Sequence, residues 1–238
     1  MMRLGLSSAA ARDAGLGELI AACVRRGLAV LELRAGDGHG VELEDALSGV
    51  LAAEQARAVG VEIAVYRASA EEDTLRLARL GEALGATLLL DGAGDVTHRA
   101  LRARRLVEAG VDAAVVVRGA GARHDARVVT SLGLAVAWDA APGERPLADD
   151  ADALLGARGA RLRHICLRGG GPEAVLHEGR GVGALMGRLA LAGYAGSLTL
   201  APGSRRYEVA WQIWLGRRGG WGCGGKAHDR TLVNLAGT

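Results

Sequence analysis

The segment DAAVVVRGAGARHDARVVTSLGLAVAWD, residues 112–139, contains the repeating unit that decides the fold. An apolar run over residues 112–118 is followed by an amphipathic stretch and then by a second apolar run over 134–139. Gly133 ends the amphipathic stretch, at a place where a helix C-terminus often requires a left-handed residue. The segment therefore predicts a strand, a helix and a second strand.

The same unit repeats along the chain. Six further apolar runs occupy residues 3–8, 28–34, 61–67, 87–91, 163–168 and 197–201. Amphipathic stretches lie between the runs, for example over 16–27 and 70–85, and several end in glycine: Gly27, Gly60, Gly85 and Gly110. Eight such units predict an α/β fold of one (β/α)8 TIM barrel. An open doubly wound sheet is the alternative, although such sheets usually have fewer strands.

Composition bounds the domain organisation and excludes several classes of function. No linker interrupts the chain, so we expect the barrel over 1–216 and a glycine-rich C-terminal tail over 217–238. The 29 basic and 27 acidic residues are well mixed, which argues against a nucleic-acid partner. No apolar run reaches the ~18 residues of a membrane span and no signal peptide is evident, so we expect a cytoplasmic protein. Lys226 is the only lysine, which excludes a Schiff base on a strand.

The last third of the chain carries a family resemblance. The segments RHICLRGG (163–170) and EGRGVGALMGRLALAGYAGSLTLAP (178–202) resemble the strand-seven motif, glycine-rich loop and ending of the xylose isomerase-like TIM barrel superfamily. That superfamily includes sugar phosphate isomerases and epimerases. The resemblance implies a divalent metal, held by carboxylates and histidines at the ends of strands five to eight.

The corresponding positions are largely substituted. They hold Arg118, Asp139 followed by Pro142, Cys166 and Ala201. A single carboxylate does not make a site for a hard divalent cation, which needs several donors. We therefore expect no divalent metal and no other cofactor. A metal site built by Asp139 with His164 and Glu32 is the alternative.

The mouth of the predicted barrel offers a candidate site of another kind. Because residues two apart on a strand share a face, one inward layer combines acids, arginines and two other groups: Glu32, Asp91 and Asp139 with Arg34, Arg118, Arg168, His164 and Cys166. Active sites of this fold lie at that end of the barrel. We assign catalysis to Glu32, Asp139 and His164, with Glu32 or Asp139 as the base, and substrate binding to Arg34, Asp91, Arg118, Cys166 and Arg168.

Arginine suits bidentate capture of carboxylate or phosphate, so the expected substrate is a small anion. A structural interpretation stands beside this one, because acids and arginines in equal numbers also form ion-pair networks. In it, His164 is a hydrogen-bonded core residue and Cys166 a small buried hydrophobe. Arg118 then either pairs with Asp139, on the neighbouring strand, or holds the substrate anion.

These observations favour an isomerase or epimerase that acts by proton abstraction on a small, anionic, sugar-like or hydroxy-carbonyl compound. One alternative is a catalytically inactive barrel that binds a small anion or a partner protein. A second alternative is a diverged lyase or cyclase. Three aromatic residues at helical spacing, Tyr207, Trp211 and Trp214, indicate packing or a homo-oligomer contact.

Overall fold

A computed structural model describes residues 2–140, 147–155, 161–168 and 185–201. The predicted tail over 217–238, the end of the predicted barrel over 202–216, residues 169–184 and Pro142 lie outside the described residues. The expected domain boundary at residue 216 therefore stays a prediction.

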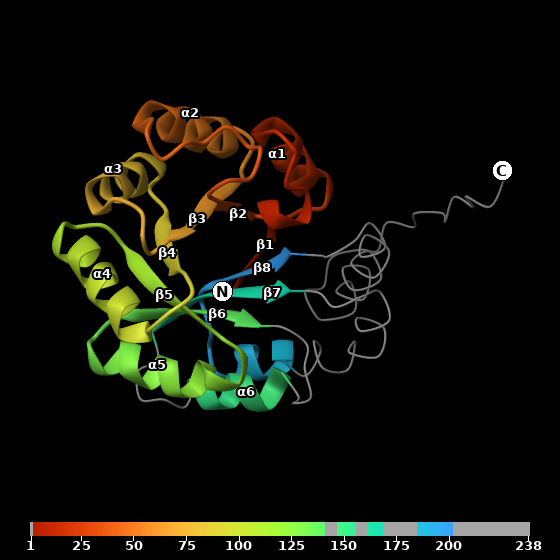
Figure 1. The fold of residues 1–238 in the computed structure, drawn as a ribbon. Coiled ribbons are helices and arrows are strands. Elements are labelled where there is room, and N and C mark those ends of the chain that lie inside the picture. Colours follow the sequence, from red (N-terminus) through yellow and green to blue (C-terminus); the bar gives the residue numbers. More distant parts are fainter. Residues whose placement is uncertain (1, 141–146, 156–160, 169–184, 202–238) are drawn as a thin grey trace, which may run out of the picture.

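Eight parallel strands close into a barrel, each pairing with its neighbours in chain order (Figure 1). The strands are β1 (Arg3–Ser7), β2 (Val30–Arg34), β3 (Glu62–Ser69), β4 (Thr87–Asp91), β5 (Ala113–Arg118), β6 (Ala135–Ala140), β7 (Leu162–Arg168) and β8 (Ser197–Ala201). The pairing of β1 with β8, which joins Arg3 to Ser197, closes the barrel. The (β/α)8 TIM barrel is confirmed, and the open sheet is excluded.

Helices surround the barrel and connect successive strands (Figure 1). They are α1 (Leu16–Arg25), α2 (Ala46–Arg57), α3 (Thr74–Leu84), α4 (Val96–Glu108), α5 (Ala122–Ser131) and α6 (Leu147–Leu155). Residues 185–191 are also helical. The glycines expected after helices all have positive φ, between 63° and 87°: Gly27, Gly60, Gly85, Gly110 and Gly133. Among the described helices, none is both long and apolar enough to cross a membrane.

The apolar core has two parts. The larger cluster packs the outer faces of the strands against the helices. The smaller cluster lies on the inner faces of β3 to β6 and consists of Val65, Leu89, Ala114, Val116, Ala135 and Ala137. Since side chains alternate along a strand, the next inward positions toward the C-terminal ends belong to Arg67, Asp91, Arg118 and Asp139. The barrel interior thus changes from apolar to charged at its C-terminal mouth.

Candidate functional site

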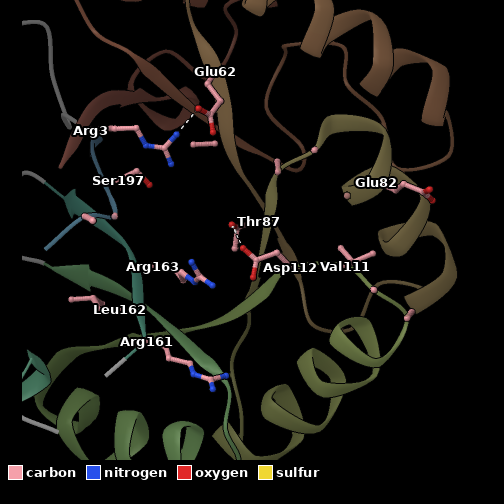
Figure 2. A pocket seen from close by; sticks show the side chains of 18 residues that line it. Arg3, Glu62, Glu82, Thr87, Val111, Asp112, Arg161, Leu162, Arg163 and Ser197 are labelled. Carbon is pink, nitrogen blue, oxygen red and sulfur yellow. Dashed lines mark hydrogen bonds and ion pairs between the residues drawn. The ribbon is translucent and has the colours of Figure 1, made fainter. Parts of the chain in front are cut away.

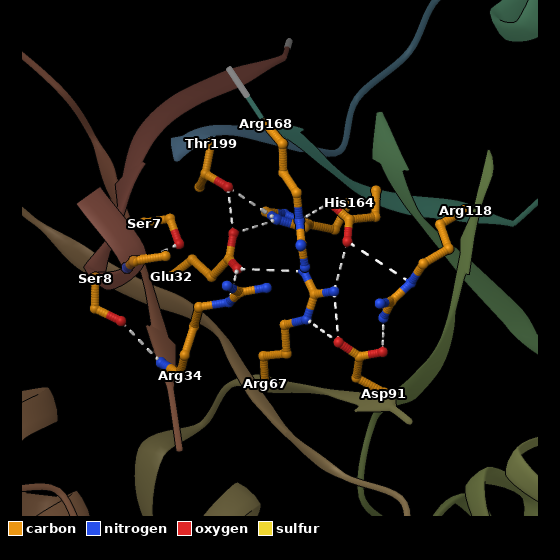
Figure 3. Close-up of polar contacts among 12 residues, drawn as sticks. Ser7, Ser8, Glu32, Arg34, Arg67, Asp91, Arg118, His164, Arg168 and Thr199 are labelled. Atoms are coloured by element: carbon orange, nitrogen blue, oxygen red, sulfur yellow. Dashed lines mark hydrogen bonds and ion pairs between the residues drawn. The ribbon is translucent and has the colours of Figure 1, made fainter. Parts of the chain in front are cut away.

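One guanidinium lies at the centre of the charged mouth. Arg67 Nη2 is 2.7 Å from Asp139 Oδ2 and 2.6 Å from Asp91 Oδ2. Arg67 Nη1 is 3.9 Å from Glu32 Oε1, and the whole residue is only 4% exposed. Figure 3 shows Arg67 between Glu32 and Asp91. Acids from β2, β4 and β6 therefore converge on a single arginine from β3.

Three further arginines lie around this centre. Arg118 forms an ion pair with Asp91, and its Nε lies 3.9 Å from Asp139 Oδ2. Arg168 Nε is 2.6 Å from Asp139 Oδ1, and Arg34 Nε is 3.4 Å from Glu32 Oε1. Among the described residues, four arginines thus meet three carboxylates, which leaves one excess positive charge when His164 is neutral.

Two of the four arginines are nearer to solvent than any of the three acids. The side chains of Arg118 and Arg168 are 44% and 38% exposed, whereas those of Glu32 and Asp139 are 0% and 2% exposed. A ligand that enters the mouth therefore meets guanidinium groups before it meets carboxylates.

A buried hydrogen-bond chain lies below the arginines. His164 Nε2 is 3.0 Å from Glu32 Oε2, and Thr199 Oγ1 donates to the same oxygen. On its other side, His164 Nδ1 is 2.8 Å from Ser197 Oγ. Burial alone raises the pKa of Glu32, but His164, Arg67 and Thr199 together hold that pKa well below its usual range. Glu32 is therefore a fixed negative charge.

Two carboxylate oxygens in the mouth lack a hydrogen-bond donor. Glu32 Oε1 and Asp139 Oδ1 are buried and accept no hydrogen bond from the described residues, although arginine nitrogens lie within 4 Å of both. Buried polar atoms of this kind are rare in folded proteins. Asp139 Oδ1 meets the Arg168 guanidinium at 2.6 Å, and Glu32 Oε1 has Arg34 Nε at 3.4 Å, so a ligand hydroxyl that displaces these contacts finds an acceptor in each oxygen.

Asp91 is held in place by the loop that follows it. The Gly92 amide donates to Asp91 Oδ1 at 2.7 Å. Arg99, a buried residue of α4, donates to the Val116 carbonyl at 3.0 Å and to the Gly92 carbonyl at 3.4 Å. The end of β4 is thereby tied to β5, and this fixes the acid that binds Arg118.

The structure brings all eight predicted site residues to the mouth or directly below it. The pairing expected between Arg118 and Asp139 is only the longer of two contacts, because the closer partner of Arg118 is Asp91. Burial, together with the charges of Glu32 and Asp139, raises the pKa of the Cys166 thiol well above its usual value. Cys166 is therefore a neutral thiol.

Sequence reasoning missed three residues of this network: Arg67, Ser197 and Thr199. A signal for Arg67 was present, since four of the apolar runs end in arginine at residues 34, 67, 118 and 168. For Ser197 and Thr199, alternation along the last run would have placed both on one face.

The side chains at the positions assigned to metal ligands lie at the C-terminal ends of β5 to β8. They are Arg118, Asp139, Cys166 and Ala201. Arginine and alanine supply no donor to a cation, and the thiol of Cys166 is neutral. Within the described part of the chain, no group of three or more His, Cys, Asp or Glu side chains is arranged to hold a metal ion. Among the described residues, these four positions therefore do not fit the metal that the resemblance implies.

A cavity of about 960 Å³ lies at the opposite, N-terminal end of the barrel (Figure 2). Its lining includes Arg3, Thr87, Asp112, Arg163 and Ser197. Active sites of TIM barrels lie at the other end, so we keep the charged mouth as the candidate site.

Comparison with known proteins shows the fold. No protein family model matches the chain, and no curated protein matches it. A probable 3-DHS dehydratase involved in petrobactin synthesis, from Bacillus anthracis, is 9% identical, with 92% of this chain and 99% of that chain covered and a TM-score of 0.67. D-psicose 3-epimerase from Clostridium cellulolyticum H10 is 15% identical, with 84% of both chains covered and a TM-score of 0.56.

A xylose isomerase domain-containing protein from Salmonella typhimurium LT2 is 16% identical, with 89% of this chain and 94% of that chain covered and a TM-score of 0.55. The chain shares its fold with these barrels. The structural neighbours thus include an epimerase, a xylose isomerase domain-containing protein and a probable dehydratase.

Proposed function

We propose that the mouth of this barrel binds a small anionic hydroxy-carbonyl compound, such as a sugar phosphate or a sugar acid, and interconverts its isomers by proton transfer. One observation carries the proposal. Partly exposed arginines lie over two buried carboxylate oxygens that accept no hydrogen bond from the described residues. Such a site matches a molecule that has both an anionic group and hydroxyl groups.

Binding begins at the exposed cations. Arg118 and Arg168 offer guanidinium groups that recognise phosphate or carboxylate with paired hydrogen bonds. Once the anion is bound, hydroxyl groups of the substrate donate to Asp139 Oδ1 and Glu32 Oε1, which satisfies both oxygens. The anion also draws Arg118 from Asp91, and this frees part of the carboxylate cluster.

We assign proton transfer to Asp139. Its carboxylate lies directly beneath Arg168 and Arg118, whereas Glu32 is sealed below by His164 and Thr199. Asp139 takes the proton from the carbon beside the carbonyl, and the C–H electron pair becomes the C=C bond of an enediolate. The arginines stabilise the negative charge that develops on oxygen. Return of the proton to the neighbouring carbon, with transfer of the hydroxyl proton from one enediolate oxygen to the other, isomerises the substrate. Return of the proton to the same carbon, after the enediolate has turned its other face to Asp139, epimerises it.

Exchange of substrate hydrogen with D₂O tests the proposal. The protein is incubated in D₂O with a panel of aldose phosphates, ketose phosphates and sugar acids, with and without EDTA, and deuterium is measured at the carbon beside the carbonyl. We expect incorporation into at least one compound, unaffected by EDTA. Asp139→Asn abolishes it, whereas the control Asp112→Asn, at the far end of the barrel, does not. Absence of exchange with the entire panel contradicts the catalytic proposal.

A second candidate function is binding of the anion without turnover. It is favoured by the ion pairs of Glu32, Asp91 and Asp139, because each of these three carboxylates already has an arginine as its partner. The same panel separates the two functions. A compound that raises the melting temperature of the protein, yet gains no deuterium and gives no new product, identifies a binding protein. A new product of lower mass identifies a lyase instead.

A further inference from the structure

We propose that Arg67 is a built-in cation that makes the mouth select anions and excludes divalent metal ions. The acids that face this arginine come from three different strands, and its nitrogens lie 2.6 Å from Asp91, 2.7 Å from Asp139 and 3.9 Å from Glu32. Among the described residues, Arg67 alone lies within 4 Å of all three acids. Arg118 contacts two of them, and Arg34 and Arg168 contact one each.

Burial and its three acidic neighbours hold this cation in place. Arg67 is 4% exposed, and a guanidinium is not deprotonated at any pH at which proteins fold. Its own strand, β3, continues beyond it, because Ala68 and Ser69 pair with Leu90 and Asp91 of β4. The backbone of Arg67 is therefore held within the sheet, and the ion pairs hold its side chain inside the barrel.

The same three carboxylates, without the guanidinium, have the chemistry of a metal site. Carboxylate oxygens, with imidazole, are donors that Mn²⁺ accepts. Two of the oxygens, Glu32 Oε1 and Asp139 Oδ1, already lack hydrogen-bond donors and are almost completely buried. Removal of Arg67 takes away the one cation that faces all three carboxylates, and each acid then keeps only the arginines that lie around the centre. A divalent cation fills the vacated central place. Arg67 thus determines which sign of charge the mouth binds.

This inference rests on the proposed function, because binding of an anionic substrate is the reason why the mouth needs a positive charge. Its test needs no substrate, so the inference can fail while the proposed function stands, and the reverse. Arg67→Met keeps most of the side-chain stem and removes the guanidinium. Arg118→Met is the matched control, because it removes the same charge from the same mouth but leaves Arg67 among the acids. Mn²⁺ binding to both variants and to the wild type is measured by titration calorimetry and by metal analysis after dialysis.

We expect Arg67→Met to bind about one Mn²⁺ per chain, at least about tenfold more tightly than the wild type or Arg118→Met. Addition of Glu32→Gln to Arg67→Met reverses the gain, because it removes one of the ligands. If Arg67→Met folds only when Mn²⁺ is present, its circular dichroism spectrum is that of a folded protein with Mn²⁺ and of an unfolded one after EDTA is added. That outcome also supports the inference.

Four outcomes overturn the inference. The first is that Arg67→Met binds no more Mn²⁺ per chain than the wild type, and the second is that the wild type binds the ion with the same affinity as the variant. Arg118→Met gains as much affinity, which attributes the effect to net charge rather than to position. Arg67→Met stays unfolded with Mn²⁺ as well as without it, which means that a divalent ion does not fill the place of the guanidinium.

Discussion

Arg67 and Asp139 form a buried ion pair across the barrel mouth, with Nη2 2.7 Å from Oδ2. The two residues are 72 positions apart in the chain, on β3 and β6. Withdrawing both charges from water is costly, and their attraction offsets that cost only when the geometry is good and the remaining atoms are satisfied. Some of these remaining polar atoms are satisfied by the further arginines around Asp139 and by the hydrogen bonds to Glu32.

Asp139→Asn lowers the free energy of unfolding by about 3–5 kcal/mol, the usual result of removing one partner of a buried pair. The substitution leaves the guanidinium of Arg67 with less negative charge beside it. Urea unfolding followed by circular dichroism measures the change. Asp112→Asn is the control: its carboxylate is exposed and hydrogen-bonded to Thr87, so we expect a far smaller loss. Equal losses for the two variants contradict the structural role of Asp139.

Arg118→Met changes the free energy of unfolding by less than about 1 kcal/mol, because a half-exposed ion pair is screened by solvent. The guanidinium is 44% exposed and pairs with Asp91 at the rim. Its loss nevertheless weakens the binding of inorganic phosphate, since one of the exposed cations is removed. Calorimetric titration with phosphate, together with urea unfolding, separates the two effects. Unchanged phosphate affinity removes Arg118 from the binding site.

Glu32 makes the free energy of unfolding decrease as the pH becomes acidic. Because its folded pKa is lowered, ionised Glu32 stabilises the protein fully above the unfolded value of about 4.3. That stabilisation is lost as the pH falls further, toward the folded pKa. The difference in unfolding free energy between the wild type and Glu32→Gln should be constant from about pH 5 to 8 and should shrink below about pH 4. A difference that grows on acidification reverses the assigned sign.

Cys166 and Cys23 resist alkylation in the native protein. Burial raises the pKa of both thiols, that of Cys23 to about 11, and the thiolate is the reactive form. Peptide mapping after iodoacetamide treatment at pH 8 should find both unmodified, and both modified after unfolding in guanidinium chloride. Modification of native Cys166 means that solvent reaches the barrel interior beside Asp139.

The sequence predicted the strands and the side chains at their ends closely. The run over 112–118 became β5 (Ala113–Arg118), and Gly133 ended the following helix with positive φ, because periodicity and glycine placement are local properties. Alternation then placed Glu32 and Arg34 on one face, and likewise His164 and Arg168.

What the sequence by itself determined, then, is the barrel and the set of charges at its mouth. Only the tertiary structure decided which charges meet. The third run was expected to end at Arg67, but β3 continues to Ser69 through pairing with β4, and this puts Arg67 inside the sheet. Contacts from β3 to β6, or from β2 to β7, join strands that are not neighbours in the sheet. They depend on how a closed barrel staggers its strands around its axis, which no local pattern of residues records.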